Sequence, residues 1–188
     1  MNKKIPATPN FKEIDASAPS SAAQRTEVLA LIGNLVFTWS NNESMFIYVL
    51  MLLMRVDFET AAITFVSLNT TRARLDLIRR LAKTKCKDPA AVRKLEKLID
   101  RFNECTKVRN DFNHCIYQLD ATGRITHTNV LRLIEDKKGV RFADLRAVDR
   151  ERLDEVASTI RKLTLLNRDM WAFLRELEGL QDSRATSA

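Results

Sequence analysis

Residues that form turns are scarce in this chain, which has only four glycines and four prolines among its 188 residues. A many-stranded sheet reverses direction often and uses these residue types at its turns, whereas long helices need few reversals. The scarcity therefore predicts a mainly helical fold. The 45% hydrophobic content is enough for one sizeable core.

Apolar residues recur at steps of three, four or seven in several long stretches, which is the spacing of a helix with one buried face. The first predicted helix runs from about Arg25 to Arg55, and a second begins near Asp57. After cap residues at 67–71 comes an amphipathic run, and a further helix starts with Asp88 as N-cap and Pro89 at its first position and runs to about Tyr117. The last helix follows Asp149 and keeps its rhythm through Leu153, Val156, Ile160, Leu163, Asn167, Met170, Leu174 and Leu177.

Strand and turn residues gather in one place, between the last two helices. The sequence DATGR at 120–124 predicts a turn, and ITHTNVLRLI and GVRFADLRAV around EDKKG predict a β-hairpin. The predicted fold is an antiparallel bundle of four to five helices with this short hairpin inserted before the last helix. We expect a flexible arm at 1–23, a helical domain at 24–181 and a flexible tail at 182–188.

The chain is basic, with a formal net charge of +7 and a pI of about 9.5, which fits a polyanionic partner such as a nucleic acid and fits equally an ordinary basic soluble protein. The first residues lack the apolar region of a secretory signal, and the most apolar run, at 45–54, is half the length of a membrane span. We therefore expect a cytoplasmic protein with no membrane partner. No metal-ligand spacing, phosphate-binding loop or paired carboxylates stand out, so no metal or other cofactor is expected.

One short run concentrates the polar chemistry. KVRNDFNHCIYQ at 107–118 holds Arg109, Asn110, Asp111, Asn113 and His114 between apolar residues. On a helix, Asn110 and His114 are one turn apart on the same face, so the amide can orient the imidazole. Arg109 would lie about 140° round the helix from His114. The other histidine, His127, falls in the hairpin and is expected to be an ordinary surface residue.

The run from Arg109 to His114 resembles the R-x4-6-H signature of the HEPN superfamily, with Asn110 at the polar position that often follows the arginine. FTWSNNESMF at 37–46 also resembles the first-helix pattern of several bacterial HEPN families. The resemblance covers about residues 25–178 and implies a helical bundle. One toxin branch has a tyrosine two residues after the histidine, whereas here Tyr117 comes three residues after it.

The resemblance implies a metal-independent endoribonuclease that cuts RNA through the 2′-hydroxyl, as a toxin or phage-defence component. It implies that Arg109 and His114 are catalytic and that Asn110 orients them. Such domains pair, so a homodimer would bring two histidines and two arginines into one cleft. An antitoxin or another defence-system protein would be a further partner. The side chains expected to line the cleft are those of Glu43, Asp111, Asn113 and Tyr117.

Each of these interpretations has a plainer alternative. Arg109 and His114 could form the rim of a helix, with a salt bridge and no catalysis. Glu43 falls on the predicted core-facing side of the first helix, four residues after Trp39. Its carboxylate would either pair with Arg109 or line the cleft. The alternative is a partly solvated glutamate at the margin of that side. A basic cluster is either an RNA track or a solvated helix face, and its members are Arg72, Arg74, Arg79, Arg80, Lys83, Lys85 and Lys87. The alternative function is a non-catalytic HEPN-like bundle that binds a partner protein or RNA.

Overall fold

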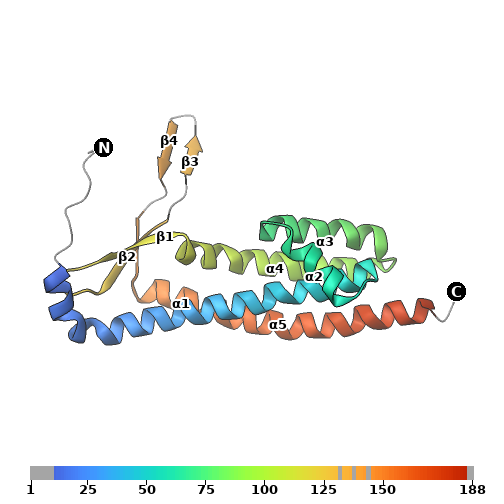
Figure 1. Cartoon of the computed structure of the whole chain (residues 1–188), viewed down its shortest axis with the longest axis horizontal. Coiled ribbons are helices and arrows are strands. Elements are labelled where there is room, and N and C mark those ends of the chain that lie inside the picture. The colour runs from blue at the N-terminus through green and yellow to red at the C-terminus, as the bar shows by residue number, and fades with distance from the viewer. Residues whose placement is uncertain (1–10, 131–132, 137–138, 143–144, 186–188) are drawn as a thin grey trace. The chain divides into compact units, whose positions relative to one another are not determined.

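The computed structural model describes the backbone of residues 11–130, 133–136, 139–142 and 145–185 (Figure 1). Within these ranges the chain forms five helices and five short strands, so it is mainly helical, as the scarcity of turn residues predicts. The first ten residues of the predicted arm and residues 186–188 of the predicted tail lie outside the described residues.

Most of the predicted helix starts are confirmed by their caps. Asp57 accepts a hydrogen bond from the backbone N–H of Thr60 (2.8 Å), and the carboxylate of Asp149 accepts one from Arg152 (2.9 Å). These bonds satisfy backbone donors that the first turn of a helix leaves without partners. The helices are α1 (Phe11–Met54), α2 (Phe58–Val66), α3 (Thr71–Lys85), α4 (Pro89–Asn113) and α5 (Arg150–Ala185).

The first helix differs from its prediction at its start. α1 begins at Phe11, whereas the apolar spacing predicts a start near Arg25. The segment SAPSSAAQ at 17–24 is rich in alanine and serine and has no apolar stripe. Alanine favours the helix without contributing to a periodic pattern, so the periodicity does not report this part of α1.

The described chain divides into two compact units. One unit holds the residues up to Gly33 together with Asn110–Ala157, and the other holds Asn34–Arg109 together with the residues from Ser158 onward. We call them the sheet unit and the helical unit. The division passes between Arg109 and Asn110, inside the run that concentrates the polar chemistry.

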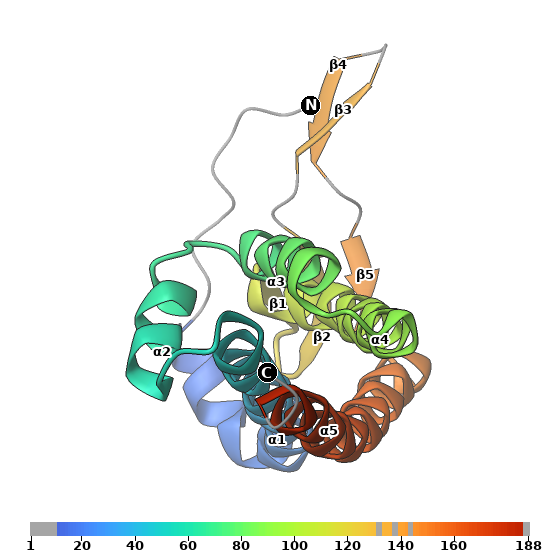
Figure 2. The same ribbon diagram turned by 90° about the vertical axis from the view of Figure 1, so that its right-hand side faces the viewer.

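In the helical unit, segments of four helices and the short α2 pack around one core. Seen end on, α3 lies beside α4, and α1 lies beside α5 (Figure 2). Trp39 of α1 and Phe102 of α4 stack with ring centroids 5.3 Å apart, and Phe46 meets Phe102 edge-on at the same distance. Asn42 of α1 donates to the carbonyl of Leu163 in α5 (3.1 Å). Leu163 belongs to the apolar stripe predicted for the last helix and is fully buried.

The sheet unit has a three-stranded antiparallel sheet. Its strands are β1 (Cys115–Leu119), β2 (Ile125–Val130) and β5 (Leu145–Ala147), in the order β1-β2-β5. A second antiparallel pair joins β3 (Leu133–Asp136) to β4 (Gly139–Phe142). The pairing of β2 with β5 and of β3 with β4 confirms the predicted hairpin, and Asp120 accepts backbone hydrogen bonds from Thr122 and Arg124 in the predicted turn.

The predicted end of the fourth helix is wrong. The apolar spacing predicts that this helix runs to about Tyr117, but α4 ends at Asn113 and the next residues form β1. Tyr117 pairs with Thr128 of β2, and Cys115 pairs with Val130. Isoleucine and tyrosine in CIYQL favour a strand once a partner strand is present, and that partner comes from the tertiary structure.

Gln24 ties α1 to the sheet inside the sheet unit. Its amide nitrogen donates to the carbonyl of Ile125 (3.0 Å), and its amide oxygen accepts from the N–H of the same residue (3.2 Å). Ile125 is buried with Val28, Val148 and Leu153. Two hydrogen bonds across 101 residues therefore fix where β2 begins against α1.

We predict that Gln24→Ala lowers the free energy of unfolding by about 1–2 kcal/mol, because two backbone groups lose their side-chain partner. The amide of Ile125 should exchange its hydrogen faster. Chemical denaturation and hydrogen exchange measure the two effects. Gln118→Ala, at an exposed position of β1, is the control and should change neither. Unchanged exchange at Ile125 in Gln24→Ala would show that the amide does not anchor the strand.

Candidate functional site

The guanidinium of Arg109 lies on an aromatic platform in the helical unit. Its central carbon is 4.1 Å from the centroid of the Trp39 ring. The indole N–H donates to the hydroxyl of Thr106 (2.8 Å), which in turn donates to the carbonyl of Phe102 (2.8 Å). The ring is thus held by a hydrogen bond and by its stacking on Phe102. A fixed indole face is the strongest cation–π surface that a protein offers, so it positions the arginine.

Partial burial places this cation in a poorly solvated position. Burial lowers the pKa of the Arg109 guanidinium from its ordinary value, while the nearby carboxylate of Glu43 acts in the opposite direction. An arginine side chain stays protonated in proteins in spite of such shifts. The result is a half-buried positive charge whose attraction for an anion is less weakened by water than that of a surface arginine.

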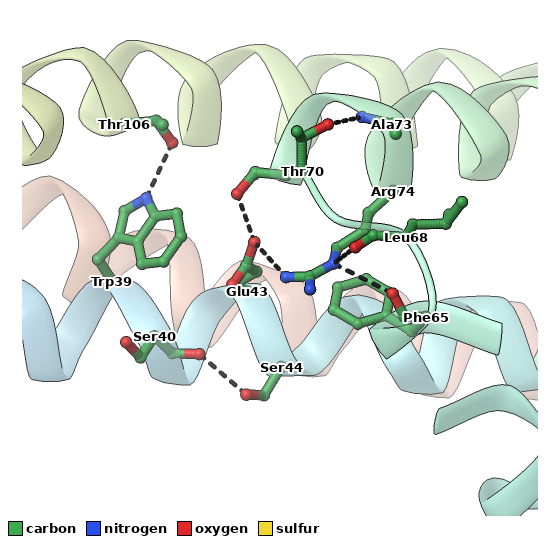
Figure 3. A network of polar contacts seen from close by, with 11 residues as sticks. Trp39, Ser40, Glu43, Ser44, Phe65, Leu68, Thr70, Ala73, Arg74 and Thr106 are labelled. Carbon is green, nitrogen blue, oxygen red and sulfur yellow. Dashed lines mark hydrogen bonds and ion pairs between the residues drawn. The ribbon is translucent and has the colours of Figure 1, made fainter. Parts of the chain in front are cut away.

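Glu43 is the centre of a polar network between α1 and α3 (Figure 3). Its carboxylate accepts hydrogen bonds from the hydroxyl of Thr71 (2.6 Å) and from Arg74 (3.2 Å). Arg74 also donates to the carbonyls of Phe65 (3.1 Å) and Leu68 (3.0 Å). The carboxylate thus forms its ion pair with Arg74 of α3, and its effect on Arg109 is electrostatic.

His114 lies in the sheet unit, at the bend that follows α4. Its side chain is exposed, and its backbone N–H donates to the carbonyl of Asn110 (3.0 Å), which completes the last turn. Asn110 and Asn113 are exposed at the same end of the helix. The histidine is therefore accessible to a substrate and belongs to the turn between α4 and β1.

Asp111, expected in the cleft, holds an ion-pair cluster in the sheet unit. Its carboxylate accepts from Arg152 (2.9 Å) and from Arg146 (3.0 Å). The Arg152 side chain is only 9% exposed, also pairs with Glu155, and stacks over the ring of Phe112 at 4.9 Å. A buried guanidinium requires such partners because an unpaired charge in the interior is costly. These contacts give Asp111 a structural role.

Tyr117, also expected in the cleft, packs against the core of the sheet unit. Its hydroxyl donates to the carbonyl of Phe112 (2.6 Å). Burial raises the pKa of this phenol well above its ordinary value. The hydroxyl therefore stays protonated at neutral pH and its proton is bound to the backbone, so Tyr117 is poorly suited to act as a base.

The predicted basic track on α3 carries both signs of charge. Arg79 pairs with Asp100 of α4 (2.6 Å), and Lys83 pairs with Glu96 (3.4 Å). Arg72 is almost fully exposed and lies 3.9 Å from Asp76, and Arg80 is exposed. A face on which cations alternate with carboxylates attracts a polyanion less than its number of basic residues suggests. This arrangement favours the solvated-face alternative.

Two arginines were not predicted to form partly buried ion pairs, although a signal for each existed: Arg74, which belongs to the predicted basic cluster, and Arg152. Arg74 lies four residues before Ile78, and Arg152 lies four residues before Val156. Residues four apart share a helix face, and Ile78 and Val156 are fully buried. A charged residue at this spacing from a core residue predicts a buried ion pair, and its partners, Glu43 and Asp111, come from other helices.

No group of three or more histidine, cysteine, aspartate or glutamate side chains that could hold a metal ion occurs in the described part of the chain. In the same residues, no helix is both long enough and apolar enough to cross a membrane. No protein-family model, curated protein or solved structure matches this chain. The chemistry proposed below therefore rests on the residues of this chain.

We predict that Asp111→Asn lowers the free energy of unfolding by about 2–3 kcal/mol. This is less than the cost of breaking a fully buried pair, because Glu155 still neutralises part of the Arg152 charge. Thermal unfolding of the purified variant measures this loss in the free energy of unfolding. Asp154→Asn removes a carboxylate from an exposed pair with Arg150 and should cost less than about 0.5 kcal/mol. Equal stability of the two variants would show that Asp111 has no structural role, and it would again be a candidate for the cleft.

Proposed function

We propose that this chain is a metal-independent endoribonuclease of the HEPN type that acts as a toxin or phage-defence component. In this proposal the helices form an antiparallel bundle, and two copies of the chain form one RNA-cutting cleft. Arg109 and His114 are the catalytic residues, and Asn110 orients them. The observation that carries the proposal is the Arg109 guanidinium held on the Trp39 ring, five residues before an exposed histidine.

The proposed reaction needs no group from outside the protein and its substrate. The 2′-oxygen of one nucleotide attacks the adjacent phosphorus, and the bond from phosphorus to the 5′-oxygen breaks. One imidazole takes the proton of the 2′-hydroxyl, and an imidazolium gives a proton to the departing 5′-oxygen. The products are a 2′,3′-cyclic phosphate and a 5′-hydroxyl. The guanidinium stabilises the extra negative charge on the phosphorane oxygens.

The environment of Arg109 suits a guanidinium that stabilises phosphorane oxygens. Stacking on Trp39 uses the face of the guanidinium, whereas its N–H donors lie in the plane of the group, in a fork that matches two phosphate oxygens. A cation that is already positioned and partly desolvated needs little reorganisation when the transition state forms. Lysine would keep the charge and lose both the stacking and the fork.

A second copy supplies what one chain lacks. Transesterification uses a base and an acid, and one motif contains a single histidine. Two motifs related by a two-fold axis contain two, and a two-fold contact is self-complementary. The alternative function, a non-catalytic module that binds RNA or a protein, is favoured by one observation: Asp111 and Tyr117, expected in the cleft, are bound to structural partners.

We predict that the purified chain cuts RNA in the presence of EDTA and leaves 2′,3′-cyclic phosphate ends. His114→Ala should slow cleavage by about 10²–10⁴-fold, because a proton-transfer group is lost. Arg109→Ala should slow it by about 10²-fold or more, as for the loss of a preorganised donor, and Arg109→Lys should not restore the rate. Single-turnover cleavage of a labelled RNA, followed by end-group analysis, measures these rates.

His127→Ala is the matched control, because it removes the other histidine. This variant should cut RNA at the same rate as the unaltered chain. Circular dichroism checks that each variant is folded. A 2′-deoxy substitution at the scissile nucleotide should block the cut. If the unaltered chain cuts no RNA, or if His114→Ala cuts as fast, the nuclease proposal is wrong and the binding-module alternative replaces it.

We predict that the chain is a dimer at micromolar concentration and that activity per chain falls on dilution, since half of each cleft comes from the second copy. Sedimentation velocity gives the mass, and cleavage rates over a dilution series give the dependence. Mixing His114→Ala with the unaltered chain distinguishes shared clefts from separate ones, because a mixed dimer holds one histidine where a shared cleft needs two, so cleavage should fall by more than the fraction of unaltered chain. A monomer with undiminished specific activity would falsify the two-copy cleft.

A further inference from the structure

A groove of about 610 Å³ lies between α1 and α5 in the helical unit. Its α1 wall runs from Asn34 to Tyr48, and its α5 wall runs from Thr164 to Trp171. α1 serves two sites here, because Trp39 bonds to Thr106 of α4 whereas Asn41, two residues later, lines the groove. The groove is thus separate from the platform that holds Arg109, although one helix contributes to both.

Amide side chains are unusually frequent in this groove. Asn34, Asn41, Asn42 and Asn167 all belong to its lining. Asn42 is fully buried; its nitrogen donates to the carbonyls of Thr38 and Leu163, and its oxygen has no hydrogen-bond partner among the residues that the structure describes. Asn167 donates to the sulfur of Met45, which is a weak acceptor. Amide groups offer both donors and acceptors, so the wall can bond a flat ligand edge that has both.

Three aromatic residues stand at the groove with much of their surface in solvent. Phe37 is 67% exposed, Trp171 is 49% exposed and Tyr48 is 37% exposed. The rings of Tyr48 and Trp171 lie with their centroids 6.2 Å apart. Exposed aromatic faces beside hydrogen-bonding groups provide stacking surfaces for a planar heterocycle.

The charge of the groove selects among planar ligands. Its lining contains no acidic side chain among the residues that the structure describes, and it contains Arg168. Arg168 is exposed and has no ion-pair partner within the described part of the chain, whereas its neighbour Asp169 pairs with Arg101 (2.6 Å). One unpaired guanidinium at the margin of an aromatic and amide surface suits a ligand with one phosphate for each flat ring.

We propose that this groove binds a nucleotide of single-stranded RNA, with the base stacked on the exposed aromatic rings. The amides bond the edge of the base, as asparagine does with adenine, and Arg168 pairs with the phosphate. This inference deepens the proposed nuclease function and rests on it, since it supplies a substrate-binding surface outside the catalytic cleft.

Other occupants fit the groove less well. An apolar helix would leave the exposed amides of Asn34 and Asn41 facing carbon atoms, which costs hydrogen bonds. A polyanion without bases would find a single cation and would not use the aromatic rings. A neutral sugar can stack and form hydrogen bonds but has no use for the unpaired Arg168. Each of these occupants gives a different result in the test below.

The test measures the binding of a labelled single-stranded oligoribonucleotide by fluorescence anisotropy, with His114→Ala in every protein so that the RNA stays intact. Trp171→Ala and Asn41→Ala should each weaken binding, Trp171→Ala by about tenfold or more because one stacking surface is lost. Arg168→Gln should reduce the slope of log affinity against log salt by about one.

Two variants serve as matched controls. Trp171→Phe keeps an aromatic face and should bind within about threefold of its parent, an estimate that follows from the sequence-tolerant nature of stacking. Leu165→Ala removes an exposed apolar side chain from α5 outside the groove and should bind as the parent does. Heparin and a neutral oligosaccharide should compete poorly with the oligonucleotide.

Three results would overturn the groove inference. The first is a protein that binds no oligonucleotide, and the second is equal affinity for Trp171→Ala and its parent. The third is a shift of Trp171→Ala towards monomer in sedimentation without loss of RNA binding, which would make the groove a contact between copies. Strong competition by heparin or by the oligosaccharide also counts against it and identifies the other ligand class.

The two proposals fail separately. If the unaltered chain cuts RNA and Trp171→Ala still binds and cuts as well, the groove inference fails and the nuclease proposal remains. If the unaltered chain cuts nothing but binds RNA through Trp171, the nuclease proposal fails and the groove belongs to an RNA-binding module.

Discussion

The indole of Trp39 joins α1 to α4, and the candidate site depends on that contact. One face of the ring stacks on Phe102 in the core, the N–H bonds to Thr106, and Arg109 lies over the ring. The side chain is only 4% exposed, so its position is set by close packing. A rotation of either helix would move the indole and with it the cation. The position of Arg109 is therefore a property of the packed core.

Partly buried ion pairs recur in both units and give several charged residues near the motif a structural partner. Glu43 neutralises Arg74 in the helical unit, and Asp111 neutralises Arg152 in the sheet unit. Each pair shields two charges partly from water, so the loss of one partner leaves a costly unpaired charge on the other. Charged residues close to a candidate active site in sequence can therefore have structural partners, and Arg109 and His114 remain the proposed catalytic residues.

α1 places two kinds of chemistry on one rigid element. Trp39 and Glu43 bond to the α4 and α3 side, and Asn41 and Tyr48 line the groove that α1 forms with α5. Residues two apart on a helix lie on nearly opposite sides, so a run such as TWSNNES supplies both faces within two turns. The proposed RNA-binding groove and the Arg109 platform are thus built from the same short segment.

The sequence by itself determined the mainly helical class, the helix start near Asp57, the N-caps at Asp88 and Asp149, and the hairpin, because these depend on local spacing and on the few turn residues. It also singled out Arg109 and His114 by their residue types. Only the tertiary structure decided that α4 stops before His114, since β2 provides the partner that makes Cys115–Leu119 a strand. It alone decided the partners of Glu43 and Asp111 and the groove between α1 and α5. Spacing along one helix shows which face is buried, whereas contacts between distant segments depend on how the helices pack against each other.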